Sequence, residues 1–401
     1  MNVRILLSIS LFTCVCVNTF AQSKLLTIND AVQGQRSYLA PKRMNQLQWV
    51  KGTNKYSYLE RQGNREVIIT GEPGRKEKDA IFASDLVGAR MAEYGIDSFA
   101  GFPPFQWMDA NTIVFTYKNR LVYFDVAEKR IRTSATWEDK AENLDMDPSL
   151  NQIAYTVENN LYIMGKGGAK LIVSNDPDKG HVYGGAKVHR NEYGVSKGTF
   201  WSPNSNYLAF YRMDESMVTE YPVMNIETHP ATVNMIRYPM AGQKSHEVTL
   251  GIYDLNEMKS HYLNIAGDKE HYITNISWSR DETKIYVALL NRHTDSCWYQ
   301  IYDVKSGNLI KTWSIFTAPT YVEPLFPLQY LGNSNKLIWR TYVLAPDKKS
   351  TREVIRIMDE NGNVMSNLDF VPAFAVGDIY AFDDKGYYFS YFTNGGLDKV
   401  L

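Results

Sequence analysis

The chain has 401 residues, of which 44% are hydrophobic and 22% charged, so it can build a packed core and lacks the composition of a disordered protein. Its formal net charge is -1 and its Lys and Arg residues form no long run, which argues against a nucleic-acid or anionic-lipid partner. Aromatic residues make up 13%, led by 27 Tyr, and such residues favour strands. We therefore expect an all-β protein.

The first residues have the pattern of a secretion signal. Arg4 supplies a positive start, residues 5–17 form an apolar stretch too short to span a bilayer, and small residues suit cleavage after Ala21. We predict a signal peptide over residues 1–21, an N-terminal extension over 22–46, and export to the periplasm or out of the cell. An uncleaved anchor is the alternative. No other segment is apolar for long enough to cross a membrane, so no stable span is expected after cleavage.

The cysteine content indicates a protein that is stabilised by its hydrophobic core and not by internal disulfides. Cys14 and Cys16 lie in the predicted signal, which leaves Cys297 as the one cysteine of the mature chain. A single thiol cannot form an internal disulfide. We expect Cys297 to be a small buried hydrophobic residue and not a nucleophile.

An internal repeat is the most informative pattern in the sequence. Similar units, each with an apolar or aromatic start, a polar turn and a short alternating strand, begin near residues 47, 105, 144, 200, 277, 327 and 378. Four short strands every roughly 40 to 55 residues are typical of propeller blades, which predicts a β-propeller of about seven blades over residues 47–401. A β-sandwich or two tandem β domains are the alternatives. The longer interval after residue 200 predicts that residues 213–240 leave the blade as an extended loop or hairpin, and no long segment shows helical spacing.

Three segments carry a resemblance to a known family. Residues 198–216, which include Trp201-Ser-Pro203, are followed by residues 236–242 and 248–254 with the sequences Ile-Arg-Tyr-Pro-Met-Ala-Gly and Val-Thr-Leu-Gly-Ile-Tyr-Asp. In order and spacing they resemble the N-terminal region of dipeptidyl peptidase IV, in the prolyl oligopeptidase superfamily. The resemblance implies an eight-bladed propeller that caps an α/β-hydrolase domain with a Ser, Asp and His triad. It also implies bacterial members that are often exported.

No complete catalytic machinery is evident in these residues. A literal Gly-X-Ser-X-Gly match occurs over residues 194–198, but the nucleophile elbow requires a helix after Ser196, and here a strand with Pro203 follows. We interpret Ser196 as a loop serine. The resemblance predicts that the last blade and the whole hydrolase domain lie outside these 401 residues, so we expect the chain to be inactive alone.

The resemblance also implies two substrate-binding residues. In the family, a pair of glutamates just before the Trp-Ser-Pro strand binds the free α-amino group of the peptide, and the matching stretch here, residues 189–193, contains only Glu192. A carboxylate in a partly desolvated cavity pairs well with an ammonium group. The alternative is an ordinary surface carboxylate paired with Arg190 or Lys197. Arg120 falls in the unit where the family places an arginine near the substrate carbonyl.

Other motifs predict neither a metal nor a cofactor. The seven histidines show no metal-ligand spacing. Residues 165–168 have the composition of a hairpin turn and lack the ending of a phosphate loop. Asp214 and Glu215 are adjacent on a strand and should point to opposite faces.

Two hypotheses follow. In the first, the chain is the gating propeller of an exported peptidase that removes dipeptides or tripeptides ending in proline. Its partners would then be the peptide N-terminus and an α/β-hydrolase domain, and the resemblance implies that the intact protein can form a homodimer. In the second, it is a stand-alone periplasmic propeller that binds peptide or protein without catalysis.

Overall fold

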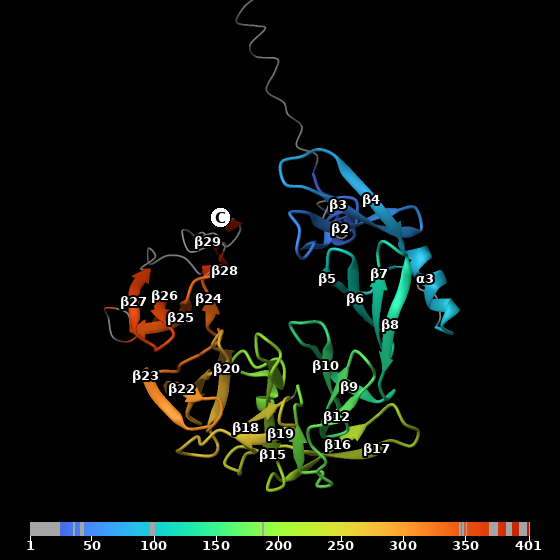
Figure 1. The fold of residues 1–401 in the computed structure, drawn as a ribbon. Helices are drawn as coiled ribbons and strands as arrows, with labels where there is room; N and C mark the ends of the chain where they lie inside the picture. Colours follow the sequence, from blue (N-terminus) through green and yellow to red (C-terminus); the bar gives the residue numbers. More distant parts are fainter. Residues whose placement is uncertain are drawn as a thin grey trace, which may run out of the picture.

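The structure is a computed structural model that describes residues 25–34, 37–40, 44–96, 101–186, 188–344, 346, 349, 351–368, 376–381, 387–392 and 399–400. Small antiparallel sheets follow one another along an arc, from the first sheet in blue to the last in red (Figure 1). The first strands β5, β20 and β24 lie toward the inside of the arc, and the fourth strands β8, β23 and β27 lie outside. The sheets are the blades of a β-propeller, as predicted.

Each of the first three blades contains four strands in sequence order. The first blade contains β1 (Asn45–Trp49), β2 (Tyr56–Gln62), β3 (Arg65–Gly71) and β4 (Lys78–Ala83). The second contains β5 (Phe105–Asp109), β6 (Thr112–Tyr117), β7 (Arg120–Asp125) and β8 (Arg130–Thr136). The third contains β9 (Ala141–Met146), β10 (Gln152–Val157), β11 (Asn160–Gly165) and β12 (Lys170–Ile172).

The fourth blade departs from this plan. It contains β13 (His181–Tyr183), β14 (Thr199–Trp201), β15 (Tyr207–Asp214), β18 (Glu247–Asp254) and β19 (Lys259–Tyr262), and both β13 and β14 pair with β15. Between β15 and β18 the chain forms a separate hairpin of β16 (Glu220–Asn225) and β17 (Thr232–Arg237). The predicted hairpin insertion is confirmed, but Met213 and Asp214 remain in β15, so the chain leaves the blade only after residue 214.

Later sheets return to the simple order. The fifth blade contains β20 (Tyr272–Trp278), β21 (Lys284–Leu290), β22 (Ser296–Asp303) and β23 (Leu309–Thr317). The sixth contains β24 (Gln329–Tyr330), β25 (Lys336–Leu344), β26 (Thr351–Asp359) and β27 (Val364–Leu368). The last described sheet contains β28 (Val376–Ala381), β29 (Tyr387–Phe392) and β30 (Lys399–Val400).

The repeat in the sequence marks the first strand of each sheet except in the fourth blade, where it marks β14, which follows β13. The units predicted near residues 47, 105, 144, 277 and 378 fall within β1, β5, β9, β20 and β28, and those near 200 and 327 fall in or just before β14 and β24. β1 begins at Asn45, two residues before the predicted start of the propeller. The predicted signal peptide, residues 1–21, lies outside the described residues.

The core consists of layers between neighbouring blades. Alternate side chains of a central strand point to opposite faces, so in β10 Ile153 and Tyr155 pack toward the second blade while Ala154 packs toward the fourth. β21 behaves in the same way, with Val287 facing the fourth blade and Tyr286 the sixth. Both faces of each central strand are therefore buried, which explains the continuous apolar runs.

Tryptophans in the inner strands of the second, fourth and fifth blades join each of these blades to the preceding one. The indole N–H of Trp107 donates to Ser57 Oγ at 2.7 Å, that of Trp201 to the Asp145 carbonyl at 2.9 Å, and that of Trp278 to the Phe200 carbonyl at 3.2 Å. Tyrosines of the central strands reach forward instead. The Tyr211 hydroxyl donates to the Ile273 carbonyl of the fifth blade at 2.7 Å.

The structure contains a ten-residue helix that was not predicted, since no long segment of the sequence shows helical spacing. α3 (Ser84–Glu93) follows β4 and buries Ser84, Val87, Gly88 and Met91. These positions have helical spacing, but only Val87 and Met91 are large and apolar, and the N-cap Ala83 makes no side-chain cap, so the signal is weak. Two short helical turns, α2 (Ile28–Val32) and η2 (Val188–Asn191), are also present. Among the described residues, no helix has both the length and the apolar character needed to cross a membrane.

Candidate functional site

The inner edge of the fourth blade is interrupted by a loop of residues 184–198, which we call the inner loop. β13 and β14 lie end to end along β15, where Tyr183 is paired with Arg212 and Thr199 with Phe210. Tyr211, between them, binds both ends of the loop: its carbonyl accepts the Gly184 N–H at 2.8 Å and its N–H donates to the Gly198 carbonyl at 2.9 Å. The inner loop is therefore a compact excursion with a closed neck on the inner side of the propeller.

Glycine is required where the inner loop is tightest. A Cβ on Gly198 would lie 2.4 Å from the Gly184 carbonyl carbon, and one on Gly194 would lie 2.6 Å from the Leu325 carbonyl oxygen. Gly194 also has a positive φ of 76°. These contacts give a structural reason for both glycines of the Gly-X-Ser-X-Gly match. Ser196 lies in the inner loop just before β14, so the strand-turn-helix geometry of a nucleophile elbow does not occur there.

Glu192 lies at the turn that follows η2. Its N–H donates to the His189 carbonyl at 3.1 Å, and its own carbonyl accepts the Val195 N–H at 3.0 Å. His189 and Tyr193, on either side, have positive φ values of 52° and 51°, so the turn is held in a conformation that packing must enforce. The Glu192 side chain is exposed and makes no ion pair or hydrogen bond within the described part of the chain. In particular, Lys197 Nζ lies 3.1 Å from Asp145 Oδ1, so this lysine pairs with Asp145 and not with Glu192.

Two tyrosines stand beside Glu192. The rings of Tyr193 and Tyr272 lie 4.8 Å apart in an edge-on arrangement, and the Tyr193 carbonyl accepts the Thr274 hydroxyl at 2.7 Å. Burial, and then the nearby Tyr272 and Glu192, raise the pKa of the Tyr193 phenol. Burial is also the largest of the influences that raise the pKa of Tyr272, and Glu192 contributes there too. The two aromatic rings and the Glu192 carboxylate form one small patch, which we call the anionic patch, and Arg292 lies at its Tyr272 side.

A second segment approaches the same patch from the fifth blade. The loop after β23 is anchored by the buried Val322, whose N–H donates to the Thr294 carbonyl at 2.7 Å. The backbone of this loop contacts the inner loop at Gly194. The next residue, Glu323, is exposed and also acts to raise the pKa of Tyr193. Sequence reasoning missed Tyr272 and Glu323, because they come from segments about 80 and 130 residues away and carry no local motif.

A cavity of about 430 Å³ lies beside the inner loop. Ser196 and Lys197 line it from the loop, with Asp145 and Trp201 from the third and fourth blades. Asp145 accepts hydrogen bonds from Lys197 and, at 2.8 Å, from the Thr199 hydroxyl. The described residues that line this cavity include no histidine, so none of them offers Ser196 an imidazole base.

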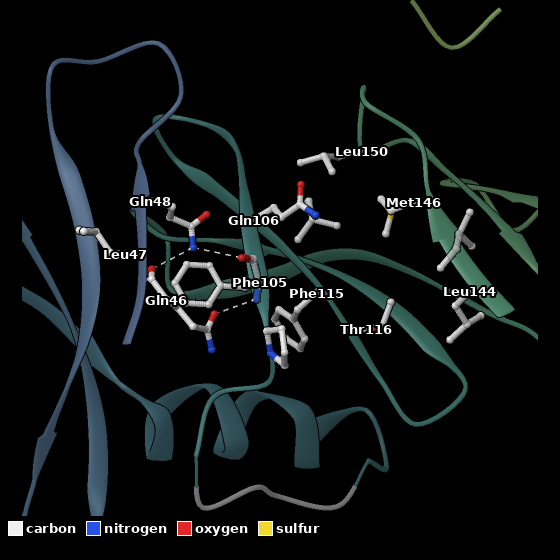
Figure 2. A pocket seen from close by; sticks show the side chains of 13 residues that line it. Gln46, Leu47, Gln48, Phe105, Gln106, Phe115, Thr116, Leu144, Met146 and Leu150 are labelled. Atoms are coloured by element: carbon white, nitrogen blue, oxygen red, sulfur yellow. Dashed lines mark hydrogen bonds between the residues drawn. The ribbon is translucent and has the colours of Figure 1, made fainter. Parts of the chain in front are cut away.

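A second cavity, of about 490 Å³, follows the inner strands of the first three blades (Figure 2). Its lining residues are all uncharged, and Gln48 and Gln106 provide amides above the rings of Phe105 and Phe115. The Gln48 side chain donates to the Phe105 carbonyl at 3.1 Å. Gln106 also lines the cavity beside the inner loop, so the two cavities are neighbours. A charged group would lose hydration here without gaining a charged partner.

A third cavity, of about 750 Å³, lies beneath the β16–β17 hairpin. Carboxylates dominate its charged lining, which consists of Glu142, Glu158, Glu215, Glu220 and Arg237, with His246 also present. The Arg237 guanidinium donates to the carbonyls of Glu215 and Ser216 at 3.0 Å. It thereby fastens the hairpin to the end of β15.

Arg120 lies apart from the inner loop. It begins β7, and its guanidinium donates to Ser134 Oγ of the adjacent β8 at 3.2 Å. It does not line any of the three cavities described above. Its predicted role at the substrate carbonyl stays a prediction.

Cys297 is fully buried between the fifth and sixth blades, as predicted. Burial raises the pKa of its thiol to about 12. Such a thiol stays protonated at neutral pH and is a poor nucleophile.

Comparisons with known proteins agree with the arrangement of the blades. The family model of the dipeptidyl peptidase IV (DPP IV) N-terminal region matches residues 110–364. A probable dipeptidyl-aminopeptidase B of Talaromyces stipitatus is 31% identical over 217 residues, which cover 45% of this chain and 23% of that protein. The chain thus spans less than a quarter of the length of this relative.

Two solved structures share the fold. A dipeptidyl-aminopeptidase-IV-like protein from Bacteroides ovatus is 28% identical with a TM-score of 0.76, over 88% of this chain and 50% of that one. The dipeptidyl peptidase 4 of Porphyromonas gingivalis is 18% identical with a TM-score of 0.68, over 94% of this chain and 55% of that one, and supports the fold alone. With the family model covering well over half of the residues, the chain belongs to the family of dipeptidyl peptidase IV N-terminal regions.

Proposed function

We propose that the chain is the substrate-gating propeller of an exported dipeptidyl-peptidase-IV-like serine peptidase, and that Glu192 binds the free N-terminus of the peptide. The observation that carries the proposal is the exposed Glu192 carboxylate, which has no ion-pair partner in the described part of the chain. It is presented by a loop whose neck and turn are fixed by hydrogen bonds. The names of the relatives, which are aminopeptidases, agree with this chemistry.

The anionic patch suits a primary ammonium group. A peptide N-terminus can form charge-assisted hydrogen bonds to the Glu192 carboxylate. The rings of Tyr193 and Tyr272 add the attraction of an aromatic face for a cation, and Glu323 adds a second negative charge. A peptide with a blocked amine offers none of these interactions and is excluded.

Binding at the amine fixes how many residues reach the reacting serine. The Ser, Asp and His triad of the proposed enzyme belongs to an α/β-hydrolase domain outside these 401 residues. Cleavage then releases dipeptides or tripeptides that end in proline, and the propeller keeps folded proteins away from the triad. The signal pattern of residues 1–21 supports export of this enzyme to the periplasm or out of the cell.

Hydrolysis of a Gly-Pro chromogenic amide tests the proposal. The assay compares the 401-residue chain, a longer product that includes the proposed hydrolase domain, and that longer product with Glu192→Gln or Glu257→Gln. Glu257 is an exposed carboxylate in the turn between β18 and β19 and serves as the control. We expect Glu192→Gln to lower kcat/KM by roughly 10- to 100-fold, the value of a charged hydrogen bond, with Glu257→Gln unchanged.

The outcomes separate the two hypotheses. An inert short chain and an active long product that depends on Glu192 support the proposal. Equal activity of the long product with and without Glu192→Gln contradicts the role of Glu192. If the gene ends at Leu401 and the chain binds Gly-Pro peptides without turnover, the stand-alone binding propeller is the correct hypothesis.

The β16–β17 hairpin is the proposed surface for homodimer formation. It projects an apolar group of exposed side chains in which Met224 is 67%, Ile226 76% and Val233 57% exposed. Contiguous exposed apolar patches mark interaction sites, and a two-fold dimer buries the same patch on both copies. We expect Ile226→Glu with Val233→Glu to convert a dimer to a monomer in sedimentation velocity. Unchanged sedimentation would remove the hairpin as the interface.

A further inference from the structure

His189 lies fully enclosed beneath the turn that carries Glu192. It is 2% exposed, and its ring packs against Tyr211 of β15 at 5.8 Å between centroids and against Tyr272 of β20 at 5.2 Å. The ring of His246, from the segment before β18, lies 5.6 Å away. Three separate segments of the fourth and fifth blades therefore meet at this imidazole.

One hydrogen bond defines the protonation state of His189. The Ile273 N–H donates to His189 Nε2 at 3.1 Å, so Nε2 carries no proton and the neutral ring carries its proton on Nδ1. Nδ1 is buried and has no hydrogen-bond partner in the described part of the chain. On the other side, the His189 carbonyl accepts the Glu192 N–H at 3.1 Å. His189 thus connects the Glu192 turn directly to β20.

The surroundings oppose a positive charge on this ring. Burial, and then the neighbouring His246 and His271, hold the pKa of His189 well below its usual range. The titratable groups that face the ring are His246 before β18, His271 and Tyr272 at β20, and Tyr211 of β15. Glu192 lies on the same turn, and the Arg292 and Glu270 pair, 3.9 Å apart, lies beyond Tyr272.

We propose that His189 is a positioning residue for Glu192. Its neutral imidazole accepts the Ile273 N–H and so holds the turn that presents Glu192. Protonation of His189 then releases this amine-binding turn at acidic pH. The binding part of this inference rests on the proposed function of Glu192. Protonation places a second N–H on Nε2, opposite the Ile273 N–H, and two donors cannot share a hydrogen bond.

The direction of the pH effect follows from linkage. The closed turn keeps His189 neutral, whereas an open turn exposes it and lets it titrate near the ordinary histidine value of about 6.5. Above that pH the closed turn has its full stability. Below it, each pH unit raises the ratio of open to closed turns by up to tenfold, until the pH reaches the lowered pKa of the closed state.

Amide hydrogen exchange of the 401-residue chain between pH 5 and 8, corrected for intrinsic exchange rates, measures this ratio. The relevant amides are those of Glu192, Val195 and Ile273. We expect their protection to fall by up to tenfold per pH unit below about 6.5 in the wild type. His189→Gln keeps an acceptor near Nε2 and cannot titrate, so its protection should stay flat. His229→Gln, at an exposed site on the hairpin, should behave as the wild type.

Peptide binding provides a second readout. Titration with Gly-Pro-Leu at pH 7.5 should give affinities within twofold for the wild type and His189→Gln, and at least tenfold weaker for His189→Phe, which has no acceptor for the Ile273 N–H. Equal pH slopes of protection in the wild type and His189→Gln would overturn the inference even if His189→Phe fails to fold. A pH-controlled turn with no Glu192-dependent binding would instead overturn the proposed function, because the exchange data do not depend on peptide.

Discussion

Gly184 and Gly198 decide where the inner loop leaves the fourth blade. Both bind the backbone of Tyr211, and the two glycines approach so closely that a Cβ on Gly198 would lie 2.4 Å from the Gly184 carbonyl carbon. Atoms at this distance overlap, so a larger residue must push the neck open. The neck in turn sets the position of Glu192, six residues before Gly198.

Gly198→Ala should therefore destabilise the chain and displace the inner loop. We expect a loss of about 1 to 3 kcal/mol, the usual cost of overpacking, and weaker peptide binding. Urea unfolding measures the first effect and titration with Gly-Pro-Leu the second. Gly167→Ala is the matched control, since a Cβ there meets nothing within 4 Å. Equal stability of the two variants would show that the neck can relax without cost.

A second residue-scale prediction concerns Asp176, which anchors β13. Its carboxylate lies 2.7 Å from His181 Nδ1 and accepts the Tyr183 hydroxyl at 2.8 Å. The Asp178 backbone N–H, and then these two side chains, lower the pKa of Asp176 to about 2. An unfolded aspartate titrates near 3.9, so the carboxylate stabilises the fold fully above about pH 4 and loses this effect as the pH falls toward 2.

Asp176→Asn should lower the urea midpoint at pH 6, and the difference from the wild type should shrink between pH 4 and 2. Asp79→Asn serves as the control, because the Asp79 side chain is 78% exposed and lies 3.9 Å from its ion-pair partner Lys55. A difference for Asp176→Asn that stays constant with pH would mean that the lost packing, and not the charge, is responsible.

At this scale the sequence predicts one candidate site residue but not its neighbours. Glu192 could be assigned through the resemblance because its segment adjoins the Trp-Ser-Pro strand. Tyr272 and Glu323 could not, since only the folding of the fifth blade against the inner loop brings them to Glu192. The burial of His189 was equally hidden, because its partners come from β15 and β20.

At the scale of elements, tryptophans of the first strands add hydrogen bonds between blades to the packing of the central strands. Trp278 of β20 packs between the fourth and fifth blades, and its indole bond to the Phe200 carbonyl spans the two sheets. Removal of this donor deletes the hydrogen bond between the two sheets. The repeated aromatic residue in the sequence is thus a joint between blades as well as a marker of their start.

Trp278→Phe should destabilise the chain by about 1 to 3 kcal/mol, through the lost hydrogen bond and the lost volume. Trp298→Phe in β22 of the same blade is the control, because Trp298 is a partly buried residue on the same core layer and its indole makes no such inter-blade bond within the described residues. Urea unfolding of both variants measures the difference. A larger loss for Trp298→Phe would contradict the importance of the indole bond.

The strands could be predicted from the sequence and helix α3 could not, for one physical reason. A central strand such as β21 is apolar on both faces because a blade covers each face, and this produces a strong run of residues. Helix α3 covers only the edge of the first two blades, so two large apolar residues, Val87 and Met91, suffice for it.

At the scale of the whole molecule, stability is distributed over successive inter-blade layers and has no single centre. Each layer contains residues from two consecutive blades, so a change in one layer should affect its two blades first. The number and order of blades followed from the repeat. The arc itself, shown in Figure 1, depends on how neighbouring sheets twist and pack, which no short motif records.

The opposite directions of the tryptophan and tyrosine bonds have a consequence for biosynthesis. The N-terminal blades are synthesised first, so the third-blade acceptor of Trp201 precedes it along the chain and is available before Trp201. The Tyr211 hydroxyl, in contrast, must wait for Ile273 of the next blade. The second, fourth and fifth blades can therefore dock on the preceding blade through their own tryptophans, and the fifth blade also satisfies Tyr211, which favours assembly from the N-terminus to the C-terminus.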